Sequence, residues 1–140
     1  MNPGFGSFPV ITKVYSSATR VFKSTLANVN SSDAPLCLAC HDQNTITANP
    51  NLVTAKTALD SRPSAYINTD LSNDHPVGFV FDPSLSPANI KAPVKAHVTF
   101  GPTRDQMWCS TCHNVHDNQN GKFLVMSNAG SALCLDCHIR

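Results

Sequence analysis

The sequence lacks a long apolar run, and this absence excludes a membrane-spanning helix. Its longest apolar stretches, at residues 79–81 and 123–126, are far shorter than the roughly 20 residues that cross a bilayer. It also lacks an excess of either charge, because ten Lys and Arg nearly balance nine Asp and Glu. No basic stripe indicates a nucleic-acid partner, and no charged block indicates an arm that binds a membrane surface. We therefore expect neither nucleic-acid binding nor a membrane span.

Charged residues are scarce as well, at 14% of the 140 residues, whereas the chain contains ten prolines. This composition is typical of a loop-rich chain with few long helices. A loop-rich chain of this length has difficulty building an ordinary hydrophobic core from its side chains alone. We therefore expect another kind of group to fill the interior.

The six cysteines form three Cys-x-x-Cys pairs, and a histidine directly follows each pair. An even number of cysteines in a short exported chain usually indicates disulfides. With six histidines in 140 residues, chance would place one after all three pairs on the order of once in ten thousand sequences. Cys-x-x-Cys-His instead attaches haem c, because two thiols join the haem vinyl groups and the imidazole binds iron. The three sets, which predict three covalently attached haems, are Cys37, Cys40 and His41; Cys109, Cys112 and His113; and Cys134, Cys137 and His138.

Two other uses of cysteine pairs fit the pattern less well. A structural zinc ion needs four ligands, and three pairs do not divide evenly into tetrahedral sites. Thioredoxin-like redox chemistry needs a βαβ context, which the sequence does not indicate. Haem attachment is therefore the favoured interpretation.

Three further histidines, His75, His97 and His116, match the three iron positions that the motif histidines leave open. The sequence thus predicts three irons that each bind two histidines. Met107 and Met126 are alternative axial ligands, although we expect them to pack against porphyrin.

Chain reach limits the assignment of His116. It lies three residues after His113, so the two Cα atoms are at most roughly 10 Å apart even in an extended chain. Two imidazoles on opposite faces of one iron separate their Cα atoms further than that. We therefore expect His116 to cap a neighbouring haem, whereas His75 and His97 stay unassigned.

Each haem motif is expected to lie on a short helical turn, which places two thioethers and an imidazole at one haem edge. Asp33, Thr103 and Ser131 are candidates for the starts of these turns. A further helix is predicted at residues 52–59, before Pro63. The segment 122–126 fits either a short strand or a cover over a haem.

The expected fold is a mostly irregular, haem-cored multihaem cytochrome c with a few short α-helices and little or no β-strand. Residues 1–31 contain neither Cys nor His, so we expect an N-terminal arm without haem ligands. Residues 32–140 then form the three-haem cytochrome domain. The first four residues lack the basic and apolar regions of a signal peptide. Because haem is attached outside the cytoplasm, we expect a leader to have been removed and the protein to be extracellular or periplasmic.

The segment from Cys109 to His116, followed by Cys134-Leu-Asp-Cys137-His138, resembles the doubled Cys-x-x-Cys-His multihaem cytochromes. Residues 73–78, Asn-Asp-His-Pro-Val-Gly, are similar to the segment that often supplies a distal ligand upstream of that pair. The resemblance covers roughly residues 73–138. It implies closely spaced bis-histidine haems that transfer electrons in periplasmic or extracellular respiration. Some relatives polymerise into extracellular filaments, or nanowires, with a continuous haem stack.

Three functions are therefore considered. The first is an electron-conducting subunit, with other copies of itself as partners in a filament. The second is a monomeric periplasmic shuttle that exchanges electrons with redox partner cytochromes. The third is a small reductase, which needs an open iron position that a Lys in place of the motif His commonly provides. None of the three motifs has that Lys, so we expect an electron conduit without catalytic residues.

Overall fold

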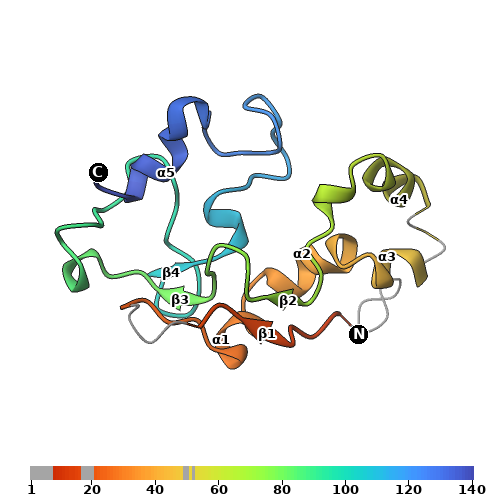
Figure 1. The fold of residues 1–140 in the computed structure, drawn as a ribbon, viewed down its shortest axis with the longest axis horizontal. Helices are drawn as coiled ribbons and strands as arrows, with labels where there is room; N and C mark the ends of the chain where they lie inside the picture. Colours follow the sequence, from red (N-terminus) through yellow and green to blue (C-terminus); the bar gives the residue numbers. More distant parts are fainter. Residues whose placement is uncertain (1–7, 17–20, 49–50, 52) are drawn as a thin grey trace. The chain divides into compact units, whose positions relative to one another are not determined.

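Most of the chain lies in loops and turns, as Figure 1 shows for the computed structural model. Residues 8–16, 21–48, 51 and 53–140 are described. Within these ranges the longest helices have eight residues, and none is long and apolar enough to cross a membrane. The chain divides into two compact units, and we describe each by itself. The first unit comprises residues 1–18 and 23–78, and the second comprises residues 19–22 and 79–140.

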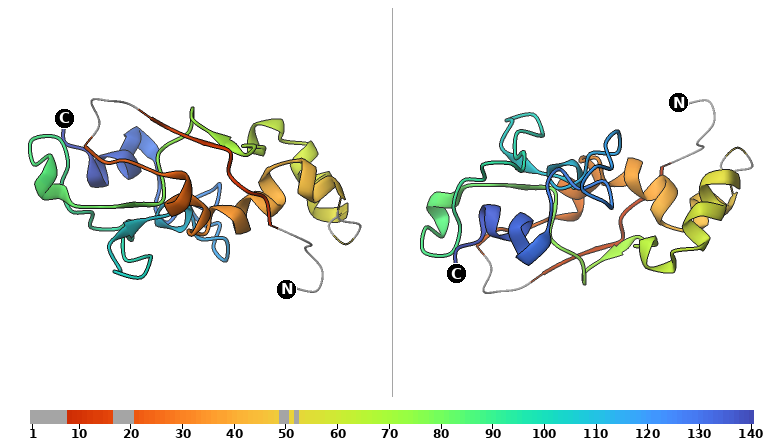
Figure 2. Two further views of the ribbon diagram at one scale, coloured as in Figure 1. Left: turned by 90° about the horizontal axis from the view of Figure 1, so that it is seen from below. Right: turned by 90° about the horizontal axis from the view of Figure 1, so that it is seen from above.

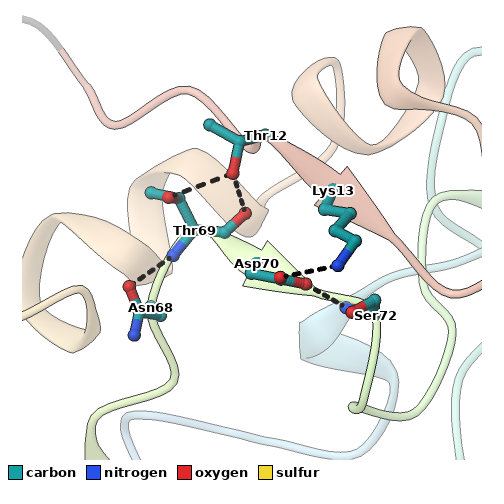
Figure 3. A network of polar contacts seen from close by, with 6 residues as sticks. All are labelled: Thr12, Lys13, Asn68, Thr69, Asp70 and Ser72. Carbon is teal, nitrogen blue, oxygen red and sulfur yellow. Dashed lines mark hydrogen bonds and ion pairs between the residues drawn. The ribbon is translucent and has the colours of Figure 1, made fainter.

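A small parallel sheet attaches the N-terminal segment to the rest of the first unit. Strand β1 (Lys13–Val14) pairs with strand β2 (Asp70–Leu71), in register from the first residue of each. Figure 3 shows the polar contacts beside this pair, in which the Thr12 hydroxyl donates to the Thr69 carbonyl oxygen at 3.2 Å. The first residues of the two strands form an exposed ion pair, which adds little stability. The backbone pairing therefore sets the register.

Short helices make up most of the remaining first unit. Proline stands in the first turn of two of them, α2 (Ala34–His41) and the 3₁₀ turn η2 (Pro63–Ala65), and polar side chains satisfy first N–H groups of others. Thr25 accepts the N–H of Asn28 at 3.2 Å, and Asp42 accepts the N–H of Thr45 at 2.8 Å. The other helices of this unit are α1 (Leu26–Asn30), α3 (Asn44–Ala48) and α4 (Val53–Asp60).

The core of the first unit is formed by apolar residues from the strands and from α1 to α3. Its members are each at most 8% exposed, and α4 contributes no buried residue. Gly78 packs directly against α1, since a Cβ at this position would lie 2.8 Å from the Val29 Cα. The buried apolar residues of this unit are Ile11, Val29, Ala34, Leu38, Ala39, Ile46 and Leu71.

The second unit is built on a two-stranded antiparallel sheet. Strand β3 (Phe79–Val80) pairs with strand β4 (Gln106–Met107). Beside it lies a small apolar cluster that includes a haem-motif cysteine; its buried members are Phe79, Phe81, Met107 and Cys137. Phe22 packs on this cluster, with its ring centroid 5.4 Å from that of Phe79. The helical elements, seen from two further directions in Figure 2, are η3 (Pro83–Leu85), η4 (Cys109–Thr111), η5 (Ala129–Ser131) and α5 (Ala132–Cys137).

The predicted fold class is confirmed: the described chain is mostly irregular, with short helices and two sheets of two strands each. A helix does occupy most of the predicted range 52–59, although residue 52 lies outside the described residues, as do residues 1–7 and 17–20 of the predicted arm. The segment 122–126 forms a single bridge between Leu124 and His113 rather than a strand. The division into an arm and one haem domain concerns haem binding, and it stays a prediction.

Two of the three predicted helix starts are in the right place, and one is wrong. Asp33 and Ser131 directly precede α2 and α5, although neither side chain caps its helix. Thr103 does not start the turn of the second motif, because the chain first enters β4 and the turn begins after Trp108. Pairing with β3 therefore overrides the local N-cap pattern at Thr103.

Candidate haem-binding sites

The first motif lies on α2, so its three donor residues share one face of a helix. Cys37 and Cys40 are one turn apart, and His41 is the last residue of α2. Residues three and four positions apart on a helix are surface neighbours. The two intervening residues, Leu38 and Ala39, are buried, whereas all three donors are half-buried. The helix is therefore fixed by its spacer residues, and the donors face outward from the core.

The His41 ring is held in one tautomer by the backbone. Its Nδ1 lies 2.6 Å from the Ala65 carbonyl oxygen, and this oxygen can only accept a hydrogen bond. The proton must therefore be on Nδ1, which leaves the Nε2 lone pair for a metal. A backbone acceptor on the second nitrogen is the usual way in which proteins orient a histidine ligand.

The second motif has the same helical form, within a shorter turn. Cys109 begins η4, Cys112 caps it, and the His113 N–H donates to the Cys109 carbonyl oxygen at 3.1 Å. Thr111 is fully buried, and its Oγ1 accepts the Trp108 N–H at 2.9 Å. This hydrogen bond satisfies one of the N–H groups at the start of the turn. The turn is thus fixed by a spacer residue, as in the first motif.

The loop after the second motif supplies a backbone acceptor for its histidine. The Nδ1 of His113 lies 3.1 Å from the Lys122 carbonyl oxygen, which assigns the same tautomer as in His41. Lys122 and Phe123 both have left-handed backbone conformations, with φ of 52° and 55°. Such conformations are costly for residues other than glycine and persist where surrounding contacts hold them. Here Asn118 accepts the Phe123 N–H at 2.9 Å, so the loop is held in the form that presents its carbonyl to His113.

The third motif lies on α5. The His138 N–H donates to the Cys134 carbonyl oxygen at 2.9 Å, which continues the helical turn to the histidine. Cys134 and His138 are exposed, whereas Cys137 is 8% exposed within the apolar cluster. All three motifs therefore form the helical turn that the sequence predicts.

A buried carboxylate lies between the two cysteines of the third motif. Asp136 accepts three backbone N–H groups, from Val94 at 3.1 Å and from Lys95 and Ala96 at 2.8 Å each. Burial alone would raise the pKa of this carboxyl, but the three N–H groups and the charge of Lys91 hold its pKa below the usual value. Sequence reasoning missed this residue, because nothing local distinguishes it from the solvated spacers of such motifs.

One cysteine of each motif has a raised thiol pKa. Burial raises the pKa of Cys40, and the nearby Cys37 and Asp42 raise it further. The pKa of Cys137 rises to about 11, mainly through burial. None of the six cysteines is in a disulfide bond.

The second and third motifs lie close together within the second unit. Burial raises the pKa of the Cys112 thiol, and its electrostatic interaction with the nearby Cys134 raises it further. Cys112 in turn raises the pKa of Cys137. In the described part of this unit, however, no three Cys, His or acidic ligand atoms lie within 4.8 Å of one another, as a tetrahedral zinc site requires.

The three spare histidines lie in loops, and all three are exposed. His75 is in the first unit, where its Nδ1 lies 3.0 Å from the Pro76 carbonyl oxygen. His97 and His116 are in the second unit. His97 lines a hollow of about 240 Å³ together with His113. The structure therefore brings one spare histidine to a motif histidine, and the ligand roles of all three stay predictions.

The predicted methionine alternatives lie in the second unit. Met107 is 5% exposed in the apolar cluster, and Met126 is half-buried. The packing of Met107 in this cluster favours a structural role.

The donor sets fit covalently bound haem. Each motif offers two thiols and one imidazole on a single helical turn, and backbone acceptors fix two of the imidazoles with Nε2 as the metal-binding atom. A family model described as the doubled CXXCH motif matches residues 101–140, which contain the second and third motifs. No curated protein matches the chain. The family match supports a multihaem c-type cytochrome, whose covalently bound haem serves electron transfer.

Proposed function

We propose that this protein conducts electrons through three closely packed bis-histidine c-type haems in extracellular or periplasmic respiration. The observation that carries the proposal is the repeated geometry: three helical turns, each with two cysteines one turn apart and a histidine directly after them. Haem supplies the electron transfer, since its iron cycles between two oxidation states. The residues of the chain orient it, set its potential and control its exposure.

Close spacing of the haem sites is supported by the second and third motifs. Their cysteines are near enough for the charge of one to raise the pKa of the other, as Cys112 does to Cys137. Electron tunnelling falls steeply with distance, so adjacent attachment sites favour rapid transfer between them. Both motifs lie in one compact unit, which supports conduction between two fixed sites.

The axial ligands favour low potentials and little reorganisation. Six histidines suffice for two on each of three irons, and Met107 packs in the apolar cluster. The Ala65 and Lys122 carbonyl oxygens accept hydrogen bonds from His41 and His113, which makes these imidazoles stronger electron donors to iron. Bis-histidine ligation without methionine is typical of lower potentials. This ligand set supports an electron conduit without a substrate site.

The exposure of the third motif supports electron exchange with another molecule. Cys134 and His138 are both exposed, so a haem attached there would lie near the surface. Another copy of this chain is the proposed partner, in a polymeric cytochrome filament. The alternative is a monomeric shuttle between redox partner cytochromes. A protein that stays monomeric at high concentration would favour this alternative.

A redox titration followed by visible absorption tests the conduit. We expect three haems per chain that titrate at low potential and stay six-coordinate in both oxidation states. An iron that binds cyanide readily in the native protein would contradict the proposal and favour a reductase. Electron microscopy at high protein concentration tests the filament, since discrete particles alone would contradict polymerisation.

A further inference from the structure

The hollow in the second unit contains two imidazoles, one from a haem motif and one from a spare histidine. These imidazoles, of His113 and His97, line it together with the apolar side chains of Leu124 and Val125 and the ammonium group of Lys95. The imidazoles suit iron, the apolar pair suits a porphyrin face, and the ammonium group suits a propionate. The remaining lining side chains are polar: Ser110, Asn114 and Asp117.

We infer that His97 is the distal ligand of the haem that Cys109 and Cys112 attach and His113 ligates; this inference rests on the proposed function. His113 enters the hollow with its Nδ1 bonded to the Lys122 carbonyl oxygen, so its Nε2 is the atom that binds iron. His97 is the other imidazole of the same hollow. The two come from segments 16 residues apart in the sequence, which permits approach from opposite sides.

The other spare histidine of the second unit, His116, is too close to His113 in the chain to be the distal ligand of the same iron. His116 is three residues from His113, and their Cα atoms are at most roughly 10 Å apart. This separation is too short for both imidazoles to bind opposite faces of one iron. His116 is then left for the iron of the third motif, which lies in the same unit. The second unit therefore has one spare histidine for each of its two haem motifs.

The backbone that presents His97 is held by the third motif. Asp136 accepts the N–H groups of Val94, Lys95 and Ala96, and Ala96 is 7% exposed. These three hydrogen bonds hold the backbone directly before His97. Asp136 is thus a positioning residue, which connects the attachment helix of the third haem to the distal ligand of the second.

The test replaces His97 with glycine in the full haem-loaded protein and follows spin state by electron paramagnetic resonance. In the wild type we expect three low-spin haems per chain. His97→Gly should convert one of the three to high spin, and added imidazole should restore it. Three low-spin haems in His97→Gly would overturn the inference but leave the proposed function intact. Fewer than three haems in the wild type would instead contradict the proposed function.

A variant that lacks the second haem identifies which haem loses its ligand in His97→Gly. Cys109→Ala with Cys112→Ala removes the second attachment site, so His97→Gly added to it should give no high-spin haem. A high-spin haem in that background would assign His97 to another iron and overturn the inference. His116→Gly is the matched control, since it should give one high-spin haem in both backgrounds.

An experiment on the unmodified protein covers the case in which the combined variant does not mature. In the fully reduced, diamagnetic state, nuclear Overhauser contacts report which porphyrin each histidine ring faces. The rings of His97 and His113 should contact the same porphyrin, the one joined to Cys109 and Cys112. Contacts of His97 with a different porphyrin would overturn the inference.

Discussion

Replacing Asp136 with alanine should destabilise the second unit more than the loss of any exposed carboxylate. Its two oxygens accept three backbone N–H groups, two at 2.8 Å and one at 3.1 Å, and the side chain is 8% exposed. Hydrogen bonds to charged groups contribute about 1.5–3 kcal/mol each. Because Val94 and Lys95 are exposed, we take the lower value for each of the three bonds, which gives a loss of about 4.5 kcal/mol for Asp136→Ala.

Asp136→Asn should cost less stability than Asp136→Ala, because the amide oxygen can keep two of the three hydrogen bonds. An amide oxygen in the place of Oδ2 keeps the bonds from Lys95 and Ala96 and loses the one from Val94. We therefore expect a loss of about 1.5 kcal/mol, the lower value for the one hydrogen bond lost. Urea unfolding of the haem-loaded protein, followed by circular dichroism, measures both values.

The control for the lost charge is Asp82→Asn in the same unit. Asp82 is half-buried, and its carboxylate accepts the Ser84 N–H at 3.0 Å in an exposed hydrogen bond, so we expect a cost of at most about 1 kcal/mol. Asp136→Ala should also yield some high-spin haem at the second site, because the segment before His97 loosens, and Asp82→Asn should not. Equal stability of Asp136→Ala and wild type would refute the anchoring role.

Two further predictions concern the packing around the motifs. Gly78→Ala should cost more than about 3 kcal/mol, because Gly78 has φ of 71° and its new Cβ would meet the Val29 backbone at 2.8 Å. Gly121→Ala has a nearly equal φ of 72° but no atom within 4 Å, so thermal unfolding should show only about 1–2 kcal/mol there; equal costs would refute the steric argument. Thr111→Val should cost about 1–3 kcal/mol, since it leaves the Trp108 N–H unpaired, and Thr111→Ser should recover most of it in urea unfolding. A loss in Thr111→Ser as large as in Thr111→Val would contradict the capping role of the hydroxyl.

The helical form of the three motifs was predictable because it depends on local spacing. Two cysteines three residues apart and a histidine one residue later meet on one face only in a helical turn. The scarcity of charge and abundance of proline likewise predicted the short elements. Where a segment pairs with distant residues, local patterns failed. Thr103 has the form of an N-cap, yet Arg104 adopts φ of 59° and the chain then enters β4.

The contacts that orient the histidines were beyond the sequence. The Lys122 carbonyl oxygen reaches His113 only because residues 122 and 123 both adopt left-handed conformations. Neither Lys nor Phe favours such a conformation, so the residue types do not indicate it. Asp136 acts on backbone groups about 40 residues earlier in the chain. Backbone acceptors and long-range anchors leave no residue-type signal, so a pattern of cysteines and histidines identifies the donors but not what holds them.

The most direct test of the central claim is a haem count on the purified native protein. Intact mass spectrometry gives the number of covalently bound haems, and electron paramagnetic resonance of the same sample gives their spin states. The account predicts a mass increase equal to three haems and only low-spin, bis-histidine iron. A chain with fewer haems, or with zinc in place of haem at any of the three motifs, would contradict it.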